Sequence, residues 1–145
     1  AGSSQETQVL DYPQVARRTL PWIATAYALK MTGQVMKTMH EEMEARVDGA
    51  GDDVAADMEK EVHAIGSCLK TVCTTFAVDG IEQLRRACGG HGFSMFSGLQ
   101  DLYGNAMVNF TGEGENYMLI LQGARHLLKF YSSVEAGKPV KSPNV

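Results

Sequence analysis

The chain has 145 residues, a formal net charge of −4, 44% hydrophobic residues and 21% charged residues. This length fits one domain with a buried core, and the composition is typical of a folded protein rather than a disordered one. The acidic balance without a basic block argues against a nucleic-acid partner, and the apolar runs are too short for a membrane span.

A long first helix is predicted from Pro13 to about Val47. Apolar residues recur there at spacings of three and four, which predicts one stripe that faces a core. The stripe consists of Leu20, Ile23, Ala24, Tyr27, Ala28, Met31, Val35 and Met39. Pro21 lies within this pattern and predicts a kink or a short preceding turn.

A turn and a second long helix are expected next. Residues 48–53, with the sequence DGAGDD, are predicted to form the turn, in which an aspartate caps the following helix. The second helix is expected from about Val54 to Cys88, where Gly89 and Gly90 stop it. Its apolar seam, close to a coiled-coil pattern, consists of Val62, Ile65, Leu69, Val72 and Phe76.

A short helix from Leu99 to Val108 and a last long helix complete the expected elements. The last helix is predicted to begin between Glu113 and Asn116, with acidic residues at the positive end of its dipole, and to run to about Glu135. Its apolar residues are Met118, Leu121, Ala124, Leu127, Leu128 and Tyr131. No strand is predicted, so the fold class is all-α, an antiparallel bundle of three long helices and a short one.

The expected organisation is a single helical-bundle domain over residues 11–137. Residues 1–10 are expected to be a flexible end or cloning residues, and residues 138–145 a flexible tail. The chain opens AGSS without an initiator Met, from which we expect a fragment of a larger protein.

Cysteine and histidine usage predicts no metal site. The three cysteines lack metal-ligand spacing, so buried free thiols in a reducing compartment are expected. Neither a Glu-x-x-His pair nor a His-Glu-x-x-His motif occurs, so no metal ligands are assigned. Of the four histidines only His91 stands out, because glycines flank it in a loop.

Two glycine-rich elements lie between Cys88 and Asn116. The first, Gly89 to Gly92, fits a helix C-cap followed by a tight turn, or a loop whose backbone approaches a phosphate or a ring. The second sets Glu113 between Gly112 and Gly114, where its carboxylate fits either simple stabilisation of the helix dipole or general acid/base chemistry. Spacing alone leaves both alternatives open at both elements.

The residues around these elements resemble those of the peroxisomal acyl-CoA oxidases. The resemblance covers nearly the whole chain and corresponds to the helical domain that follows the β-domain in that family. It rests on Arg86-Ala87-Cys88-Gly89-Gly90-His91-Gly92-Phe93-Ser94, Ser97-Gly98-Leu99, Glu113-Gly114-Glu115-Asn116, Leu121-Gln122-x-Ala124-Arg125, Leu10-Asp11-Tyr12, Pro21 and Ala24-Thr25-Ala26-Tyr27-Ala28.

The resemblance implies an FAD enzyme of peroxisomal fatty acid β-oxidation. Such enzymes convert a fatty acyl-CoA to the trans-2-enoyl-CoA, and O2 is reduced to H2O2. By this resemblance Glu113 is the catalytic base that removes the α-proton, while hydride leaves the β-carbon for the flavin. Base and acceptor must both be positioned, and water kept out, because the α-proton of a thioester is only weakly acidic.

The same resemblance implies the cofactor and substrate contacts. Arg86 and the loop from Gly89 to Gly92, including His91, are expected at the FAD of a partner subunit, which implies a homodimer with shared FAD. Glu115 and Asn116 are expected near the flavin nucleotide, and Gly112 and Gly114 at the acyl-thioester. Localisation in the peroxisome is implied by family alone.

Two positions depart from the family pattern. Gly112 replaces the usual Tyr or Phe before the catalytic glutamate, and Pro13 stands where Gln is usual. Two alternatives therefore stand beside the oxidase: a non-catalytic homologue or association module, and an acyl-CoA dehydrogenase that uses an electron-transfer carrier. The isolated chain is expected to be inactive, to retain little or no FAD, and to self-associate through apolar faces.

Overall fold

The computed structural model describes residues 6–50 and 53–138, which form helices and their connections. The elements are the 3-10 helix η1 (Val9–Asp11), α1 (Pro13–Ala50), α2 (Asp53–Ala87), α3 (Gly90–Phe93), the 3-10 helix η2 (Met95–Ser97), α4 (Leu99–Met107), the 3-10 helix η3 (Val108–Phe110) and α5 (Asn116–Glu135). The predicted all-α fold class, with three long helices and a short one, is confirmed.

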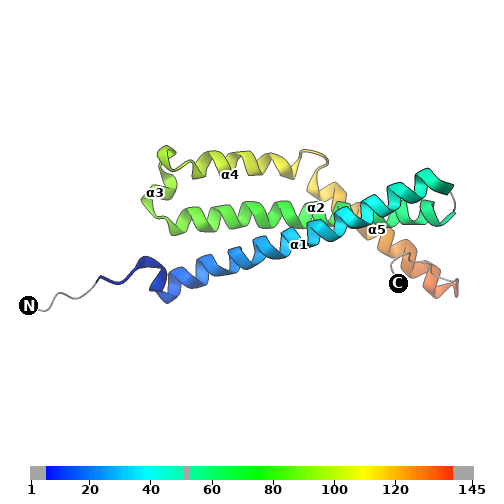
Figure 1. Ribbon diagram of the computed structural model, residues 1–145, viewed down its shortest axis with the longest axis horizontal. Coiled ribbons are helices and arrows are strands. Elements are labelled where there is room, and N and C mark those ends of the chain that lie inside the picture. The colour runs from blue at the N-terminus through cyan, green and yellow to red at the C-terminus, as the bar shows by residue number, and fades with distance from the viewer. Residues whose placement is uncertain (1–5, 51–52, 139–145) are drawn as a thin grey trace, which may run out of the picture.

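Helix α2 is the centre of the arrangement. It packs against α1, α4 and α5, whereas α1 and α4 flank it on different sides. Figure 1 shows that α1 and α2 run antiparallel, that α4 returns along α2, and that α5 crosses the α1–α2 pair at an angle. A helix with neighbours on three sides loses most of its surface to them, so the core is expected on α2.

The buried residues bear this out. The buried hydrophobic side chains of the described part all lie on α2: Ala55, Met58, Val62, Ala64 and Val78. Gly80 lets the ring of Trp22 approach the helix, since a Cβ there would lie 2.9 Å from the ring. At the crossing of α5, a Cβ on Gly123 would overlap the Cys68 sulfur. Small residues therefore set how closely the helices approach α2.

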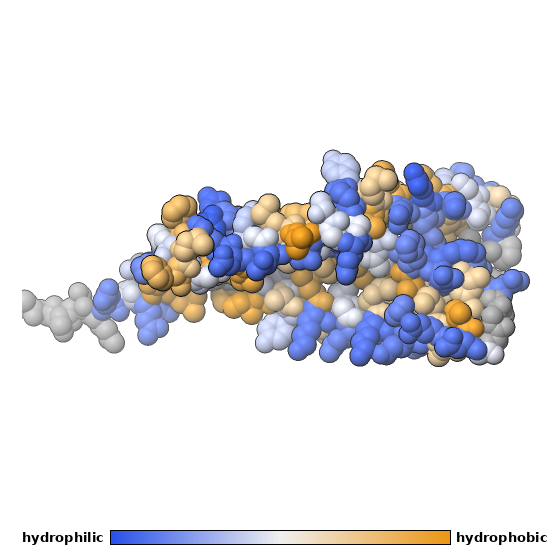
Figure 2. Space-filling view, turned by 90° about the horizontal axis from the view of Figure 1, so that it is seen from above, coloured by the Kyte–Doolittle hydropathy of each residue, from blue (hydrophilic) through white to orange (hydrophobic). Residues whose placement is uncertain are grey.

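The predicted core-facing stripe of α1 is wrong for most of its members. Leu20, Ile23, Tyr27, Met31 and Val35 are exposed, by 52–66%. The half-buried face of α1 instead carries Trp22, Thr25, Leu29, Thr32, Met36, Met39 and Met43. The reason is that α1 has one long helical neighbour, α2, and this half-buried face is the one that contacts it. Hydrophobic side chains accordingly reach the surface between hydrophilic ones (Figure 2).

The last helix shows the same pattern. Met118, Leu121, Leu127, Leu128 and Tyr131 are exposed, so their predicted packing is wrong within this chain. Helix α5 contacts α2 through the face that carries Asn116, Leu119, Gly123 and His126. The seam of α2 is correct at Val62, and partly at Ile65 and Leu69, whereas Val72 and Phe76 are exposed.

Helix ends were predicted more accurately than faces. The predicted start of α1, both ends of α2 and the end of α5 agree with the structure to within one residue. The predicted end of α1 is wrong, because the helix continues through Pro21 and includes Asp48 to Ala50, which were predicted as turn. Residues 51–52 of the predicted turn, and residues 1–5 and 139–145 of the predicted ends 1–10 and 138–145, lie outside the described residues.

The cysteines are free but not buried. Cys68 and Cys73 are half-buried and Cys88 is exposed, so the predicted burial is wrong. Cys88 is exposed because it follows the last residue of α2, in the turn before α3. None of the helices in the described part combines the length and apolar character that a bilayer crossing needs.

Candidate functional site

The loop between η3 and α5 holds Glu113 in a left-handed backbone conformation. Its φ is +58°, the only positive value at a non-glycine residue in the described part, and Gly114 follows with φ +114°. Such a conformation costs a non-glycine residue about 1–2 kcal/mol. Strain of this kind persists only where the surroundings impose it, and it gathers at functional sites.

Polar side chains of α2 and α5 surround the base of this loop. Lys70 Nζ donates hydrogen bonds to the carbonyl oxygen of Gly114 at 2.5 Å and to Asn116 Oδ1 at 2.8 Å. Asn116 Nδ2 donates to Thr74 Oγ1 at 2.8 Å, and Asn116 is only 8% exposed. The loop is thus tied to α2 by a connected set of hydrogen bonds.

Glu115 has a local structural role at the start of α5. Its carboxylate accepts a hydrogen bond from the Met118 N–H at 3.2 Å, as an N-cap does. The negative charge also lies at the positive end of the helix dipole. Two glutamates that are close in sequence therefore differ in environment, because Glu115 caps a helix and Glu113 lies in the preceding loop.

An open groove of about 510 Å³ lies beside Glu113, between α1, α2 and the start of α5. It is lined by Met36, His40, Met43, Glu59, Val62, His63, Gly66, Ser67, Lys70, Glu113 and Leu119. Its apolar members include Met36, Met43, Val62 and Leu119. The exposed carboxylate of Glu113 thus lies at an open groove whose walls are partly apolar and partly polar.

The glycine loop, residues 88–92, follows the C-terminal end of α2, whereas the Glu113 loop is tied to the middle of that helix at Lys70. Gly89 has φ +59° and precedes α3, which begins at Gly90. Gly92 is buried, and a Cβ there would overlap the carbonyl oxygen of Arg85. At Gly89 and Gly90 a Cβ would meet no atom within 4 Å, so their backbone faces open space. Gly92 thus fits against α2, whereas Gly89 and Gly90 leave an accessible backbone surface.

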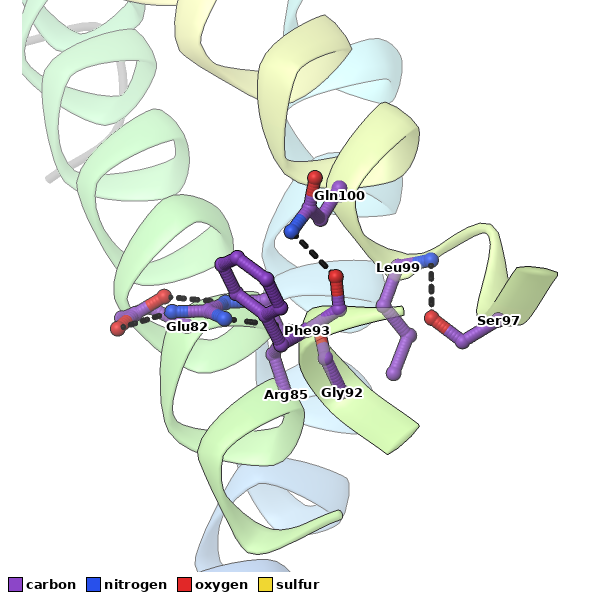
Figure 3. Close-up of polar contacts among 7 residues, drawn as sticks. All are labelled: Glu82, Arg85, Gly92, Phe93, Ser97, Leu99 and Gln100. Carbon is purple, nitrogen blue, oxygen red and sulfur yellow. Dashed lines mark hydrogen bonds and ion pairs between the residues drawn. The ribbon is translucent and has the colours of Figure 1, made fainter. Parts of the chain in front are cut away.

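An ion pair braces this loop (Figure 3). Arg85 donates to both carboxylate oxygens of Glu82, at 2.8 and 2.9 Å, and its guanidinium also reaches the Gly92 carbonyl oxygen at 3.5 Å. The hydrogen bonds from Arg85 lower the pKa of Glu82 and raise the pKa of Arg85. Gln100 on α4 donates to the Phe93 carbonyl oxygen at 2.5 Å.

The structure separates the predicted site residues into two groups. Glu113 and Gly114 are exposed, Gly112 is half-buried, and the buried Asn116 holds their loop to α2. The other group is the glycine loop, where Arg86 and His91 are exposed. Lys70 and Arg85 mark the two positions on α2, about 22 Å apart along the helix axis.

Two residues of these sites were missed from the sequence. Lys70 interrupts an apolar stretch of α2, which is a signal for a polar contact within a packed region. Arg85 follows Glu82 at the i, i+3 spacing of a helical ion pair, whereas the adjacent Arg86 was chosen instead. Within the described part, no three His, Cys, Asp or Glu residues gather as a metal site.

Comparisons with known proteins identify the family. The acyl-CoA oxidase C-alpha1 domain family matches residues 1–128. The chain belongs to the acyl-CoA oxidase family. It is 40% identical over 133 residues to acyl-coenzyme A oxidase acox-1.1 of Caenorhabditis elegans and 39% identical over 135 residues to human peroxisomal acyl-coenzyme A oxidase 1. These alignments cover 92% and 93% of this chain, and 19% and 20% of the relatives.

Solved structures of the family share the fold. The acyl-CoA oxidase-1 of Caenorhabditis elegans, complexed with FAD and ATP, matches with a TM-score of 0.85 at 37% identity over 94% of this chain and 20% of that one. An acyl-CoA oxidase of tomato matches with a TM-score of 0.86 at 37% identity over 97% of this chain and 21% of that one. The chain therefore spans about a fifth of the oxidases that it matches.

Proposed function

We propose that this chain is the C-alpha1 portion of an FAD-dependent acyl-CoA oxidase that converts a fatty acyl-CoA to the trans-2-enoyl-CoA and reduces O2 to H2O2. The observation that carries the proposal is the exposed carboxylate of Glu113, held with a positive φ at the edge of a groove with partly apolar walls. The isolated chain, at about a fifth of the relatives' length, is proposed to be inactive.

Glu113 is proposed as the general base. It would take the proton from C2 of the acyl chain, while the C3–H bond breaks with its electron pair and the C2–C3 double bond forms. A bound FAD would supply the hydride acceptor and the route by which the two electrons pass to O2, giving H2O2. A base acts on such a proton only from within hydrogen-bond reach, so the backbone that places Glu113 decides the rate.

The groove offers a site for the acyl chain. Thioether and branched aliphatic side chains line it, among them Met36, Met43 and Leu119, and methionine adapts its shape to flexible apolar ligands. Gly112 and Gly114 flank the base, and the loop packs closely there: a Cβ on Gly112 would lie 3.1 Å from the Val108 carbonyl oxygen, and one on Gly114 3.0 Å from the Leu119 side chain. Only the backbone of these two glycines can therefore face a thioester beside Glu113. Both glycines are therefore proposed as substrate contacts through their backbone.

The glycine loop is compatible with an edge of FAD. A phosphate or a ring can approach the open backbone of Gly89 and Gly90 closely, and the exposed side chains of Arg86 and His91 stand beside it. Gly92 supports the loop by its fit on α2. A relative of known structure carries FAD, which supports the same cofactor here.

A homodimer is proposed to complete the site. The glycine loop lies about 22 Å along α2 from the level of Glu113. We therefore propose that the glycine loop of one subunit contacts the FAD that works with Glu113 of the other subunit. Glu115 and Asn116 are assigned near the flavin nucleotide. The amide of Asn116 is already bonded to Lys70 and Thr74, so its contribution comes through placement of the loop. Localisation in the peroxisome is also proposed, because relatives of the chain are named peroxisomal acyl-coenzyme A oxidases.

Peroxide release by the full-length flavoprotein tests the proposal. We expect one H2O2 for each enoyl-CoA formed, and Glu113→Gln should lower kcat by about 100- to 10,000-fold with FAD still bound. Glu41→Gln is the matched control and should retain activity, because Glu41 only pairs with Lys37 on the exposed surface of α1.

Other outcomes separate the alternatives. Unchanged turnover in Glu113→Gln would refute the assignment of the base. Enoyl-CoA formation that needs an electron carrier instead of O2 would indicate a dehydrogenase. A folded, flavin-loaded protein that neither forms enoyl-CoA nor reduces its flavin would indicate a non-catalytic homologue.

A further inference from the structure

Lys70 stands out because its ammonium reaches from α2 into the backbone of the Glu113 loop. It donates to the Gly114 carbonyl oxygen, one residue after Glu113, and to Asn116 Oδ1 at the first residue of α5. Both acceptors are neutral oxygens, so the bonds are charge-assisted without forming an ion pair. Lys70 thus connects the loop and the helix start to one point on α2.

The orientation of Asn116 makes this connection specific. The Thr74 hydroxyl donates to the Lys70 carbonyl oxygen at 2.9 Å, which leaves its oxygen to accept from Asn116 Nδ2 at 2.8 Å. The amide oxygen of Asn116 is thereby turned toward Lys70. The three side chains satisfy one another in a half-buried network, where hydrogen bonds are stronger than in water.

The network lies where the backbone needs support. Glu113 has a left-handed backbone and an exposed side chain, so packing of its own side chain does not hold it in place. The short hydrogen bond from Lys70 to the Gly114 carbonyl oxygen fixes the peptide between Gly114 and Glu115, one peptide beyond Glu113. Without that bond the loop can relax to a negative φ, which would turn the carboxylate relative to the groove.

We propose that Lys70 is a positioning residue for Glu113, because it holds the loop from Glu113 to Asn116 against α2. This inference rests on the proposed function, since Glu113 must be the base for its placement to govern a rate. Lys70 touches the loop that carries the base and acts on the reaction through that loop.

The test compares Lys70→Met with Lys70→Arg in the full-length flavoprotein. Methionine keeps the apolar length of the side chain but cannot donate, whereas arginine can donate to both oxygens. We expect Lys70→Met to lower kcat on acyl-CoA by about 10- to 100-fold, since small misplacements of a reacting group have effects of this size. FAD content should stay unchanged, and Lys70→Arg should recover part of the rate.

Lys60→Met is the control on the same helix. Lys60 pairs with Asp57 at the exposed surface, outside the network, so its removal should leave kcat unchanged. Hydrogen exchange supplies a readout independent of turnover: amides of residues 112–118 should exchange faster in Lys70→Met and not in Lys60→Met.

The outcomes distinguish this inference from the proposed function. Wild-type kcat and wild-type exchange in Lys70→Met would overturn the positioning role. Faster loop exchange together with an active Glu113→Gln variant would mean that Lys70 holds the loop but that Glu113 is not the base. If Lys70→Met does not fold, Thr74→Val replaces it: a smaller fall in kcat with faster loop exchange supports the role, and no change in either overturns it.

Discussion

The Glu113 loop and the glycine loop are both anchored on α2, but by different means. Side-chain hydrogen bonds from Lys70 and Asn116 tie the Glu113 loop to the helix. The glycine loop has the brace of Arg85, but it depends mainly on a fit of backbones, because Gly92 lies against α2 where a Cβ would overlap the Arg85 carbonyl. Hydrogen bonds can hold the strained Glu113 in place, whereas the fit at Gly92 brings the backbones of the glycine loop and α2 together.

The difference predicts how each loop responds to substitution. A hydrogen-bonded loop loses a bounded amount of free energy when one donor is removed, about 1–3 kcal/mol for a charged partner. A backbone fit has no side chain that can move aside, so one added methyl group must displace a helix or a turn. The glycine loop should therefore be the more sensitive to a single added methyl group.

The largest effect is expected from Gly92→Ala. The new Cβ would overlap the Arg85 carbonyl oxygen, so the free energy of unfolding should fall by about 3 kcal/mol. Gly90→Ala is the matched control in the same loop, because a Cβ there meets nothing within 4 Å. Urea unfolding followed by circular dichroism measures both, and equal stability of the two variants would contradict the fit.

The two glutamates of the other loop should respond with opposite signs. Glu113→Gly relieves the positive φ, and after the greater freedom of the unfolded chain is counted we expect a gain of about 0.5 kcal/mol. Glu115→Ala removes the cap of α5 and should cost about 1 kcal/mol. Thermal unfolding of both variants is the measurement, and shifts of the same sign would refute the strain at Glu113.

The smallest effect is expected from pH at the brace of the glycine loop. Arg85 lowers the pKa of Glu82 below its ordinary value of 4.5, so the pair stabilises the fold above that pH. Its contribution is lost as the pH falls through the lowered folded-state pKa. Glu82→Gln should be slightly less stable than wild type at neutral pH, and the difference should vanish in acid. A pH-independent difference would show that charge is not its origin.

The positions of the helices along the chain followed from the sequence more readily than the faces by which they pack. Pro13 at the first position of α1 and Gly89 after the end of α2 obey local rules of helix starts and backbone freedom. Which face of α1 meets α2 is a matter of tertiary packing. The apolar stripe with Leu20 and Tyr27 is as regular as a core stripe, yet it points away from α2.

The site was predictable in part for a similar reason. The family resemblance pointed to Glu113 and the loop from Gly89 to Gly92, and their roles stay predictions. The positive φ of Glu113 and the bonds of Lys70 depend on how α5 crosses α2, which neither spacing nor propensity encodes. Arg85 rather than Arg86 braces the loop, because the way the chain turns after α2 decides which of the two adjacent arginines faces Gly92.

Anaerobic single-turnover reduction of the flavin tests the central claim, that Glu113 is the base and its loop placement sets the rate. Full-length wild type, Glu41→Gln, Lys70→Met and Glu113→Gln would each be mixed with acyl-CoA, and loss of the oxidised flavin absorbance followed. The account predicts equal reduction rates for wild type and Glu41→Gln, a lower rate for Lys70→Met, and the lowest for Glu113→Gln, slower than wild type by at least about 100-fold. Reduction of Glu113→Gln at the wild-type rate would contradict it.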